Sequence, residues 1–252
     1  MYPDLEDKVV IVTGAGGGIG RETVKRFVRN GALVIAADLD ETAGQETVAS
    51  TGEEKRVTYV RADVSDPESM ARLVERTVEL HGRLDVAHNN AGIELNGPLL
   101  ADVTPEQFNR VIAVNLSGVF LAMRAQIPAM AQGSGGSIIN TSSGLGVVAF
   151  AGQSAYVASK HGVIGLTKTA ALEYSSRGIR VNALLPGVVR TPMVEAIERD
   201  VPGFLEMATA KHPIGRLAVP ADIANAVLWL ASEASSFVTG ASIAVDGGFL
   251  AQ

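Results

Sequence analysis

The sequence predicts an α/β fold: a doubly wound parallel sheet of seven strands, covered by helices on both faces to give three layers. Two observations predict it. Short runs of β-branched and apolar residues recur without polar alternation, which is typical of strands buried on both faces. Segments with helical spacing of apolar residues alternate with these runs. No linker, repeat or break in composition interrupts the 252 residues, so a single domain over residues 1–252 is expected.

The first strand is expected at residues 8–13, where every residue after Lys8 is β-branched. A glycine cluster follows it directly. Residues 18–30 then have helical spacing and end at the stop signal Asn30-Gly31. Further strands are expected at residues 32–37, 57–61, 84–88, 137–141, 179–185 and 241–245.

The connecting segments carry helix signals of different strength. Thr104, Pro105 and Gln107 have the N-cap, first-turn proline and capping-box positions of a strong helix start. Other helices are expected at residues 42–50 (weak), 67–81, 221–231, and around Tyr156 as far as about Arg177. Residues 191–211 form a polar helical excursion with no strand, and residues 191–212 are expected to act as a lid over a substrate.

Composition excludes several classes of function. With 21 basic and 27 acidic residues the net charge is −6, so neither a nucleic-acid backbone nor an anionic membrane is an expected partner. No apolar run approaches the roughly 20 residues that span a bilayer. Cysteine is absent, which excludes disulfides and thiol catalysis. The four histidines have no metal-ligand spacing, so no metal is expected. Without a signal-peptide pattern, a cytoplasmic location is expected.

The glycine cluster indicates a phosphate site. Gly14, Gly18 and Gly20 fit the pattern T-G-x-x-x-G-x-G between the first strand and helix, where missing side chains let a pyrophosphate approach the free N–H groups of the helix. Gly17 and Ile19 belong to the same predicted site. A glycine-rich turn made only for tight packing is the alternative.

Asp38 indicates which dinucleotide would bind. It ends the second strand 18 residues beyond Gly20, near the interval at which an acidic residue hydrogen-bonds the ribose hydroxyls of NAD. Its charge would repel a 2′-phosphate, and neither Gly17 nor Leu39 is basic, so NAD is expected in preference to NADP. A solvated strand-end carboxylate is the alternative. Asp63 and Val64, after the third strand, are expected near the adenine.

Tyr156 and Lys160 lie four residues apart, on one face of their helix. A nearby ammonium favours a phenolate, so we expect the pKa of Tyr156 to fall from about 10 toward the range of a general acid or base. Ser143 would hydrogen-bond the same substrate oxygen. Asn115 is expected inside a helix, where it either compensates a local helix defect or holds a water near the site.

Taken together and in order, these motifs resemble the short-chain dehydrogenase/reductase family, a Rossmann-like fold, over essentially the whole chain. The motifs that carry the resemblance are Thr13-Gly14-x-x-x-Gly18-x-Gly20, Asn89-Asn90-Ala91-Gly92, Asn115, Ser143, Tyr156-x-x-x-Lys160 and Pro186-Gly187. One departure is His88, which stands where the family usually has an apolar residue.

The resemblance implies roles for these residues. Tyr156 would be the general acid/base, Ser143 would steady the substrate oxygen, Lys160 would bind the nicotinamide ribose, and Asn115 would hold a relay water. Cofactor contacts are implied at Asn90, Ala91, Gly92, Tyr156, Lys160, Pro186, Val189 and Thr191. The C-terminal segments 238–240 and 245–248 resemble a family signature that implies a homotetramer.

The expected activity is NAD-dependent interconversion of a secondary alcohol, cyclic or hydroxylated, and its ketone. Substrate contacts are expected at Glu94, Gln153, Val188 and Met193, which flank the catalytic positions. Regions 212–216 and 246–249 resemble enzymes of cyclic alcohols and diols. The alternatives are a 3-oxoacyl-(acyl-carrier-protein) reductase and a non-catalytic NAD-sensing protein.

Overall fold

The computed structural model describes residues 2–94 and 97–251, and the described chain forms the predicted parallel sheet. All strand pairs are parallel, and the seven strands have the order β3-β2-β1-β4-β5-β6-β7. The bounds are β1 Val9–Thr13, β2 Leu33–Asp38, β3 Val57–Arg61, β4 Val86–Asn89, β5 Gly136–Thr141, β6 Ile179–Pro186 and β7 Ser242–Val245. The strand order reverses between β1 and β4, which places a crevice at their carboxyl ends.

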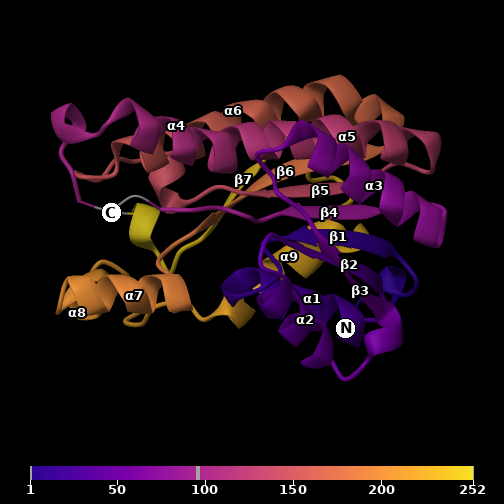
Figure 1. The fold of residues 1–252 in the computed structure, drawn as a ribbon, viewed down its shortest axis with the longest axis horizontal. Helices are drawn as coiled ribbons and strands as arrows, with labels where there is room; N and C mark the ends of the chain where they lie inside the picture. The colour runs from indigo at the N-terminus through magenta and orange to yellow at the C-terminus, as the bar shows by residue number, and fades with distance from the viewer. Residues whose placement is uncertain (1, 95–96, 252) are drawn as a thin grey trace.

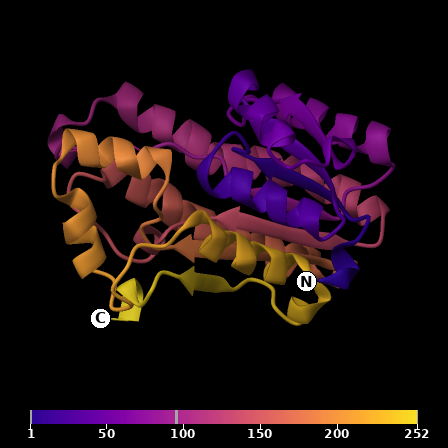
Figure 2. The same cartoon turned by 90° about the horizontal axis from the view of Figure 1, so that it is seen from below.

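Helices cover both faces of the sheet, as predicted. In Figure 1, α3, α4, α5 and α6 lie on one face, and α1, α2 and α9 on the other. Their bounds are α1 Gly18–Arg29, α2 Glu41–Ala49, α3 Pro67–His81, α4 Pro105–Ile112, α5 Gly118–Gln132, α6 Ser154–Tyr174 and α9 Pro220–Ala231. Figure 2 shows α9 against the sheet, with β7 at its edge. The doubly wound three-layer fold is therefore confirmed.

The alternation of buried side chains along the central strands explains why these strands are apolar throughout. All five residues of β1 are buried. Ile11 packs into the cluster beneath α3, α5 and α6, while Val10 and Val12 pack into the cluster beneath α1 and α9. One strand thus contributes side chains to the hydrophobic cores on both faces of the sheet. A polar side chain on either face would be buried away from water, which is unfavourable unless it is hydrogen-bonded.

The Thr104 start signal is confirmed, because the Thr104 side chain and Gln107 form a complete capping box. The helix that follows contains a π-helical turn, Ala113–Ser117, between α4 and α5. Across this turn, residues Pro105–Gln132 make one helix that contains an 18-residue stretch with a mean hydropathy of 1.4, long and apolar enough to cross a membrane by length and composition. That helix packs over the sheet beside α3 and α6, which accounts for its apolar face.

The predicted excursion is helical, as expected. It forms α7, Pro192–Asp200, and α8, Phe204–Ala210, which lie together at one end of the molecule beside the C-terminus (Figure 1). The long Tyr156 helix ends at Tyr174, and a 3-10 turn, Ser175–Arg177, completes the predicted length.

Candidate active site

A cavity of about 800 Å³ opens at the carboxyl ends of the strands, between the sheet and the α7–α8 excursion. Most of the predicted site residues line it. They are Gly14, Gly17, Gly18, Ile19, Asp38, Asn90, Ala91, Gly92, Glu94, Ser143, Gln153, Tyr156, Lys160, Pro186, Val188, Val189 and Thr191. Gly20, Asp63, Val64 and Asn115 do not line it, and the side chain of Met193 lies outside the described residues.

The glycines of the turn after β1 have different physical roles. Gly14 and Gly18 have φ values of 64° and 50°, in the left-handed region that favours glycine. A Cβ on Gly20 would lie 2.0 Å from the Gly14 carbonyl oxygen, so Gly20 lets α1 pack against the turn. A Cβ on Gly17 would meet nothing within 4 Å. Its missing side chain leaves this part of the cavity open.

The turn is also held from the neighbouring strand. Thr13 Oγ1 accepts hydrogen bonds from the backbone N–H groups of Asn90 and Ala91, at 3.0 and 3.1 Å. Asn90 Nδ2 donates to the Thr13 carbonyl oxygen at 3.1 Å. Gly17 caps α1 without any side-chain hydrogen bond to the first N–H groups of the helix. An open glycine cradle beside an uncapped helix N-terminus fits a pyrophosphate.

Asp38 is tied into this cradle. Its Oδ2 accepts from the Gly16 N–H at 2.7 Å and its Oδ1 from the Asp40 N–H at 3.0 Å, so it is more than a solvated strand-end carboxylate. The nearby cation, Arg21, was not predicted. Its guanidinium donates to the Gly16 carbonyl at 2.6 Å and forms an ion pair with Glu46 at 3.1 Å. The charge of Arg21 is therefore already paired within the protein.

The predicted adenine contacts lie further from the cavity. Asp63 Oδ1 accepts from the N–H and the hydroxyl of Ser65, at 2.9 and 2.6 Å, which is a turn-forming role. Val64 packs against Gly118 in α5. Their contact with a cofactor stays a prediction.

Ser143, Tyr156 and Lys160 meet in the cavity wall. The hydroxyls of Ser143 and Tyr156 are hydrogen-bonded, and Lys160 Nζ lies 5.5 Å from the centre of the Tyr156 ring. Lys160 Nζ donates to the Thr141 carbonyl at 2.8 Å. The Ser142 hydroxyl is directed away, to the Lys160 carbonyl at 2.8 Å. Of the two adjacent serines, therefore, Ser143 faces the tyrosine.

The expectation for the acidity of Tyr156 is wrong for this site. Burial raises the pKa of Tyr156 above its ordinary value, and the carboxylate of Glu94 raises it further; only the hydrogen bond from Ser143 lowers it. Burial also lowers the pKa of Lys160 to about 8, against an opposing effect of Glu94. The four-residue spacing correctly predicted that Tyr156 and Lys160 lie together. It could not predict their burial by the surrounding elements, which removes water from both groups and disfavours their charged forms.

Asn115 lies in the π-helical turn and is completely buried. Its Oδ1 accepts from the Ile93 N–H and its Nδ2 donates to the Ile93 carbonyl, both at 2.8 Å. Asn115 therefore joins the π-helical turn to the chain after β4, and its role as a cap of a local helix defect stays a prediction. Its contact with a water stays a prediction.

His88 is buried behind the catalytic group. Its Nε2 lies 2.9 Å from Thr141 Oγ1, and the Thr141 carbonyl is the acceptor for Lys160. Burial lowers the pKa of His88 to about 3, so the ring is neutral at physiological pH. Its Nδ1 is buried without a hydrogen-bond partner. The departure from an apolar residue thus places a polar side chain in contact with a residue of the site.

The remaining walls are the predicted substrate side of the cavity. Gln153 Nε2 donates to Glu94 Oε1 at 3.2 Å. Opposite stand apolar side chains of the excursion, including Ile197, Phe204 and Met207. Sequence reasoning missed Phe150 as a lining residue, because it comes from a segment without a motif. His212 ends the predicted lid segment and Phe249 lies in region 246–249, and both line the cavity. Within residues 2–94 and 97–251, no group of three or more His, Asp or Glu is placed to hold a metal ion.

Comparisons with known proteins agree with this geometry. The model of a family described as enoyl-(acyl carrier protein) reductase matches residues 14–250. A 2,5-dichloro-2,5-cyclohexadiene-1,4-diol dehydrogenase of Sphingobium indicum is 46% identical over 98% of this chain and 99% of the relative. A cyclohexanol dehydrogenase of an Acinetobacter species is 40% identical over 99% and 97%. A 3-oxoacyl-(acyl-carrier-protein) reductase of Thermotoga maritima is 41% identical over 98% and 99%.

Solved structures are also similar. A levodione reductase superposes with a TM-score of 0.92 at 35% identity, with 98% of each chain covered. A protein named ElxO, solved with NADP bound, superposes with a TM-score of 0.92 at 32% identity, over 98% of this chain and 100% of that chain.

Proposed function

Because the chain belongs to the short-chain dehydrogenase/reductase family, an oxidoreductase family, we propose that it interconverts a cyclic secondary alcohol or diol and its ketone with NAD. The carrying observation is that Ser143, Tyr156 and Lys160 stand in the wall of the same cavity that the glycine cradle opens into. A hydride acceptor in the cradle and a proton acceptor at the wall would then face one carbon.

The residues of the wall handle the proton. When bound, NAD supplies the hydride acceptor. Tyr156 takes the alcohol proton as a phenolate, and in reduction its phenol returns a proton to the ketone oxygen. Ser143 hydrogen-bonds the substrate oxygen and lowers the pKa of the Tyr156 phenol, and Lys160 would hold the nicotinamide ribose. Burial, and with it the carboxylate of Glu94, opposes ionisation of Tyr156, so the side chain favours the protonated phenol.

The preference for NAD rests on Asp38, which lines the cavity beside the cradle and would face a 2′-phosphate. The engaged Arg21 supports the same proposal, because it offers no unpaired cation there. The NADP of ElxO is a property of that protein. Asp38→Asn keeps the acceptor for the Gly16 N–H and removes the charge. We expect it to lower the NAD-to-NADP ratio of kcat/KM by about tenfold, equivalent to about 1.4 kcal/mol. An unchanged ratio would overturn the role of Asp38.

The class of substrate is supported by the relatives and by Glu94. The similar enzymes from Sphingobium and Acinetobacter are named for cyclic alcohols. In this chain the carboxylate of Glu94 lines the cavity and is electrostatically coupled to Tyr156. A hydroxyl on the ring, away from the reacting carbon, would donate a hydrogen bond to it. Gln153, Val188 and Met193 are the other proposed contacts, and α7–α8 is the proposed lid.

The experiment is a turnover assay that follows NADH formation with cyclic monoalcohols, cyclic diols and acyclic alcohols. We expect cyclic substrates to be oxidised, and Tyr156→Phe to lose at least about 10²-fold in kcat. Full turnover by Tyr156→Phe would refute the assignment. Tight NAD binding without turnover of any alcohol or ketone would favour the non-catalytic NAD-sensing protein. The presence of Ser143, Tyr156 and Lys160 together in the cavity wall argues against that alternative.

A second candidate is the 3-oxoacyl-(acyl-carrier-protein) reductase activity of the Thermotoga relative. It predicts faster reduction of a 3-oxoacyl thioester with NADPH than oxidation of any cyclic alcohol with NAD. The net charge of −6 disfavours an acidic carrier protein.

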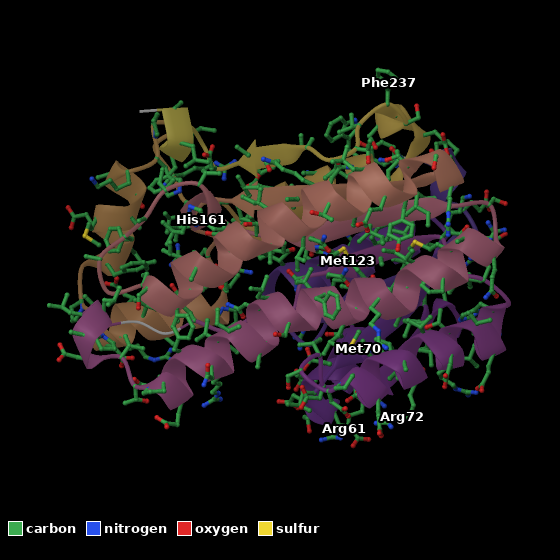
Figure 3. The ribbon with its side chains drawn as sticks, turned by 90° about the horizontal axis from the view of Figure 1, so that it is seen from above. Arg61, Met70, Arg72, Met123, His161 and Phe237 are labelled. Carbon is green, nitrogen blue, oxygen red and sulfur yellow. The ribbon has the colours of Figure 1, made fainter. Side chains whose placement is uncertain are left out.

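We also propose a homotetramer. Phe108, Phe120 and Leu172 expose apolar side chains on α4, α5 and α6. Phe237 is fully exposed and stands clear of the ribbon near the edge strand β7 in Figure 3. Two separate apolar surfaces suit two kinds of interface between copies. A cytoplasmic location stays a prediction.

A further inference from the structure

His212 joins three segments that are distant in sequence. It is buried, 3% exposed, just after α8. Its Nδ1 donates to the Ala208 carbonyl at 2.7 Å, and its Nε2 accepts from the Val188 N–H at 3.1 Å. The first bond requires a proton on Nδ1 and the second requires none on Nε2. The two neighbours therefore select one neutral tautomer of the ring.

The ring is also confined sterically. It stacks on Phe249 with 5.6 Å between ring centres. A Cβ on Gly187 would lie 2.6 Å from Nε2, so the glycine is what lets the backbone approach the ring. Just beyond the ring, the Ile214 N–H donates to the Gly247 carbonyl at 3.1 Å. The α8 end, the chain after β6 and the C-terminal segment thus meet at one side chain.

The segment that His212 holds follows β6, which pairs with β5, the strand that leads to Ser143. Val188 and Val189 line the cavity with Tyr156 and Lys160, whereas Asp38 and the glycine cradle line it from β2 and β1, beyond β4 in the sheet. The Val188 carbonyl accepts from the Ala218 N–H at 3.1 Å, so both polar groups of that residue are held. Ala208, the other partner of His212, belongs to α8, which lines the substrate side.

We propose that His212 is a positioning residue that couples the α7–α8 lid to the part of the cavity that receives the nicotinamide. Its acceptor nitrogen holds the Val188 amide in place, and its donor nitrogen binds the Ala208 carbonyl near the end of α8. Displacement of the lid would release the Val188 peptide from its partner, and the nicotinamide half of the cofactor would lose an ordered wall. The proposal rests on the proposed dinucleotide-dependent function.

Two substitutions separate the two bonds of the ring. His212→Gln carries an acceptor that reaches the Val188 N–H, while His212→Asn is too short for Val188 but still donates to Ala208. His161→Asn is a matched control, because exposed His161 has the same contact four residues back, 2.9 Å from Nδ1 to the Val157 carbonyl, and lines no part of the cavity. Figure 3 shows it on α6.

The experiment measures binding of NAD and of ADP-ribose, which lacks the nicotinamide, by calorimetry. We expect His212→Asn to weaken NAD about tenfold and leave ADP-ribose unchanged, with His212→Gln within about threefold of the parent protein. The proposal would be overturned if His212→Asn bound NAD and ADP-ribose with equally reduced affinity, or bound both as the parent protein does. It would also be overturned if His212→Gln lost as much affinity for NAD as His212→Asn. If the parent protein binds neither ligand, the proposed function fails and the inference with it. If it binds both and His212→Asn matches it, only the inference fails.

Trypsin cleavage gives a readout that needs no activity. Arg199 and Lys211 are exposed in the lid segment. NAD is expected to slow cleavage at both sites in the parent protein and in His212→Gln, and to slow it several-fold less in His212→Asn. Equal protection in the three proteins would contradict the coupling.

Discussion

Burial is the main cause of the raised pKa of Tyr156, and two side chains modify it: Glu94 raises the pKa further and Ser143 lowers it. Of the two, Glu94 can be substituted without altering the catalytic group. Glu94 raises the pKa of Tyr156 and also that of Lys160. Its removal therefore lowers both pKa values. In Glu94→Gln, the phenolate forms at a lower pH, because the negative charge that opposed it is gone.

We expect the alkaline rise of kcat/KM for alcohol oxidation to move to lower pH in Glu94→Gln. The measurement is a pH profile of kcat/KM with a cyclic monoalcohol. This substrate has no second hydroxyl, so the loss of the proposed hydrogen bond to Glu94 does not affect the profile. Asp200→Asn is the control, because that carboxylate also lines the cavity but does not contribute to the shift of Tyr156. A profile that stays in place, or moves to higher pH, contradicts the assignment.

His88 predicts a pH dependence of stability. In the folded protein its pKa is about 3, against an ordinary value of 6.5, so the unfolded chain binds more protons between these values. Stability from this group is complete above pH 6.5 and is lost as the pH falls toward 3. Between pH 7 and pH 5 the loss is about 2 kcal/mol.

The check is urea unfolding of His88→Leu and the parent protein at both pH values. Between pH 7 and pH 5, the free energy of unfolding should fall by about 2 kcal/mol less in His88→Leu than in the parent protein. This difference does not depend on how stable His88→Leu is at pH 7. Exposed His161→Leu serves as control. An equal fall in His88→Leu and the parent would show that His88 does not resist protonation.

At the scale of elements, the glycines at the junction between β1 and α1 have two different roles. Gly20 allows close packing of the backbone, whereas Gly17 is proposed to leave room for a ligand. Gly20→Ala would force its Cβ toward the Gly14 carbonyl, and we expect a loss of about 1–3 kcal/mol in the free energy of unfolding. Gly17 has an extended backbone, with φ −163°, and an added Cβ would meet no protein atom.

Gly17→Ala should therefore keep the unfolding free energy within about 0.5 kcal/mol and weaken NAD binding at least about tenfold. Thermal unfolding and calorimetry measure the two quantities on the same samples. If Gly17→Ala binds NAD normally, the open cradle is not where the pyrophosphate lies.

The π-helical turn shows how an element adapts to the site. Asn115 lies in the interior of a helix that would otherwise run unbroken from α4 to α5, yet it bonds both polar groups of Ile93. The extra residue in the turn accommodates this contact, which fixes the chain that leads from β4 to Glu94.

At the scale of the whole molecule, the proposed homotetramer rests on exposed apolar side chains. Leu172 is 88% exposed on α6. In a homotetramer, Leu172→Glu would bury a charge at an interface, and we expect a species smaller than the tetramer by size-exclusion chromatography with light scattering. Leu80→Glu on α3 should leave the tetramer intact. A monomeric parent protein, or an unchanged Leu172→Glu tetramer, contradicts this arrangement.

Local signals in the sequence determined the elements and the principal motif residues. The apolar runs, the capping box at Thr104 and the glycine turn all act over a few residues, so their helices and strands were predicted within a few residues of their bounds. The carboxyl ends of parallel strands meet at one edge, which is why Asp38, Ser143 and Tyr156 could be expected to line one cavity.

Only the tertiary structure decided how those residues behave. The raised pKa of Tyr156 and the depressed pKa of Lys160 arise from burial, which depends on every element that surrounds them. The contact of the buried His88 with Thr141 and the bond from the Val188 N–H to His212 join residues that no spacing in the sequence relates. Short-range chain preferences predict the elements of this protein, whereas desolvation and contacts across the fold determine its chemistry.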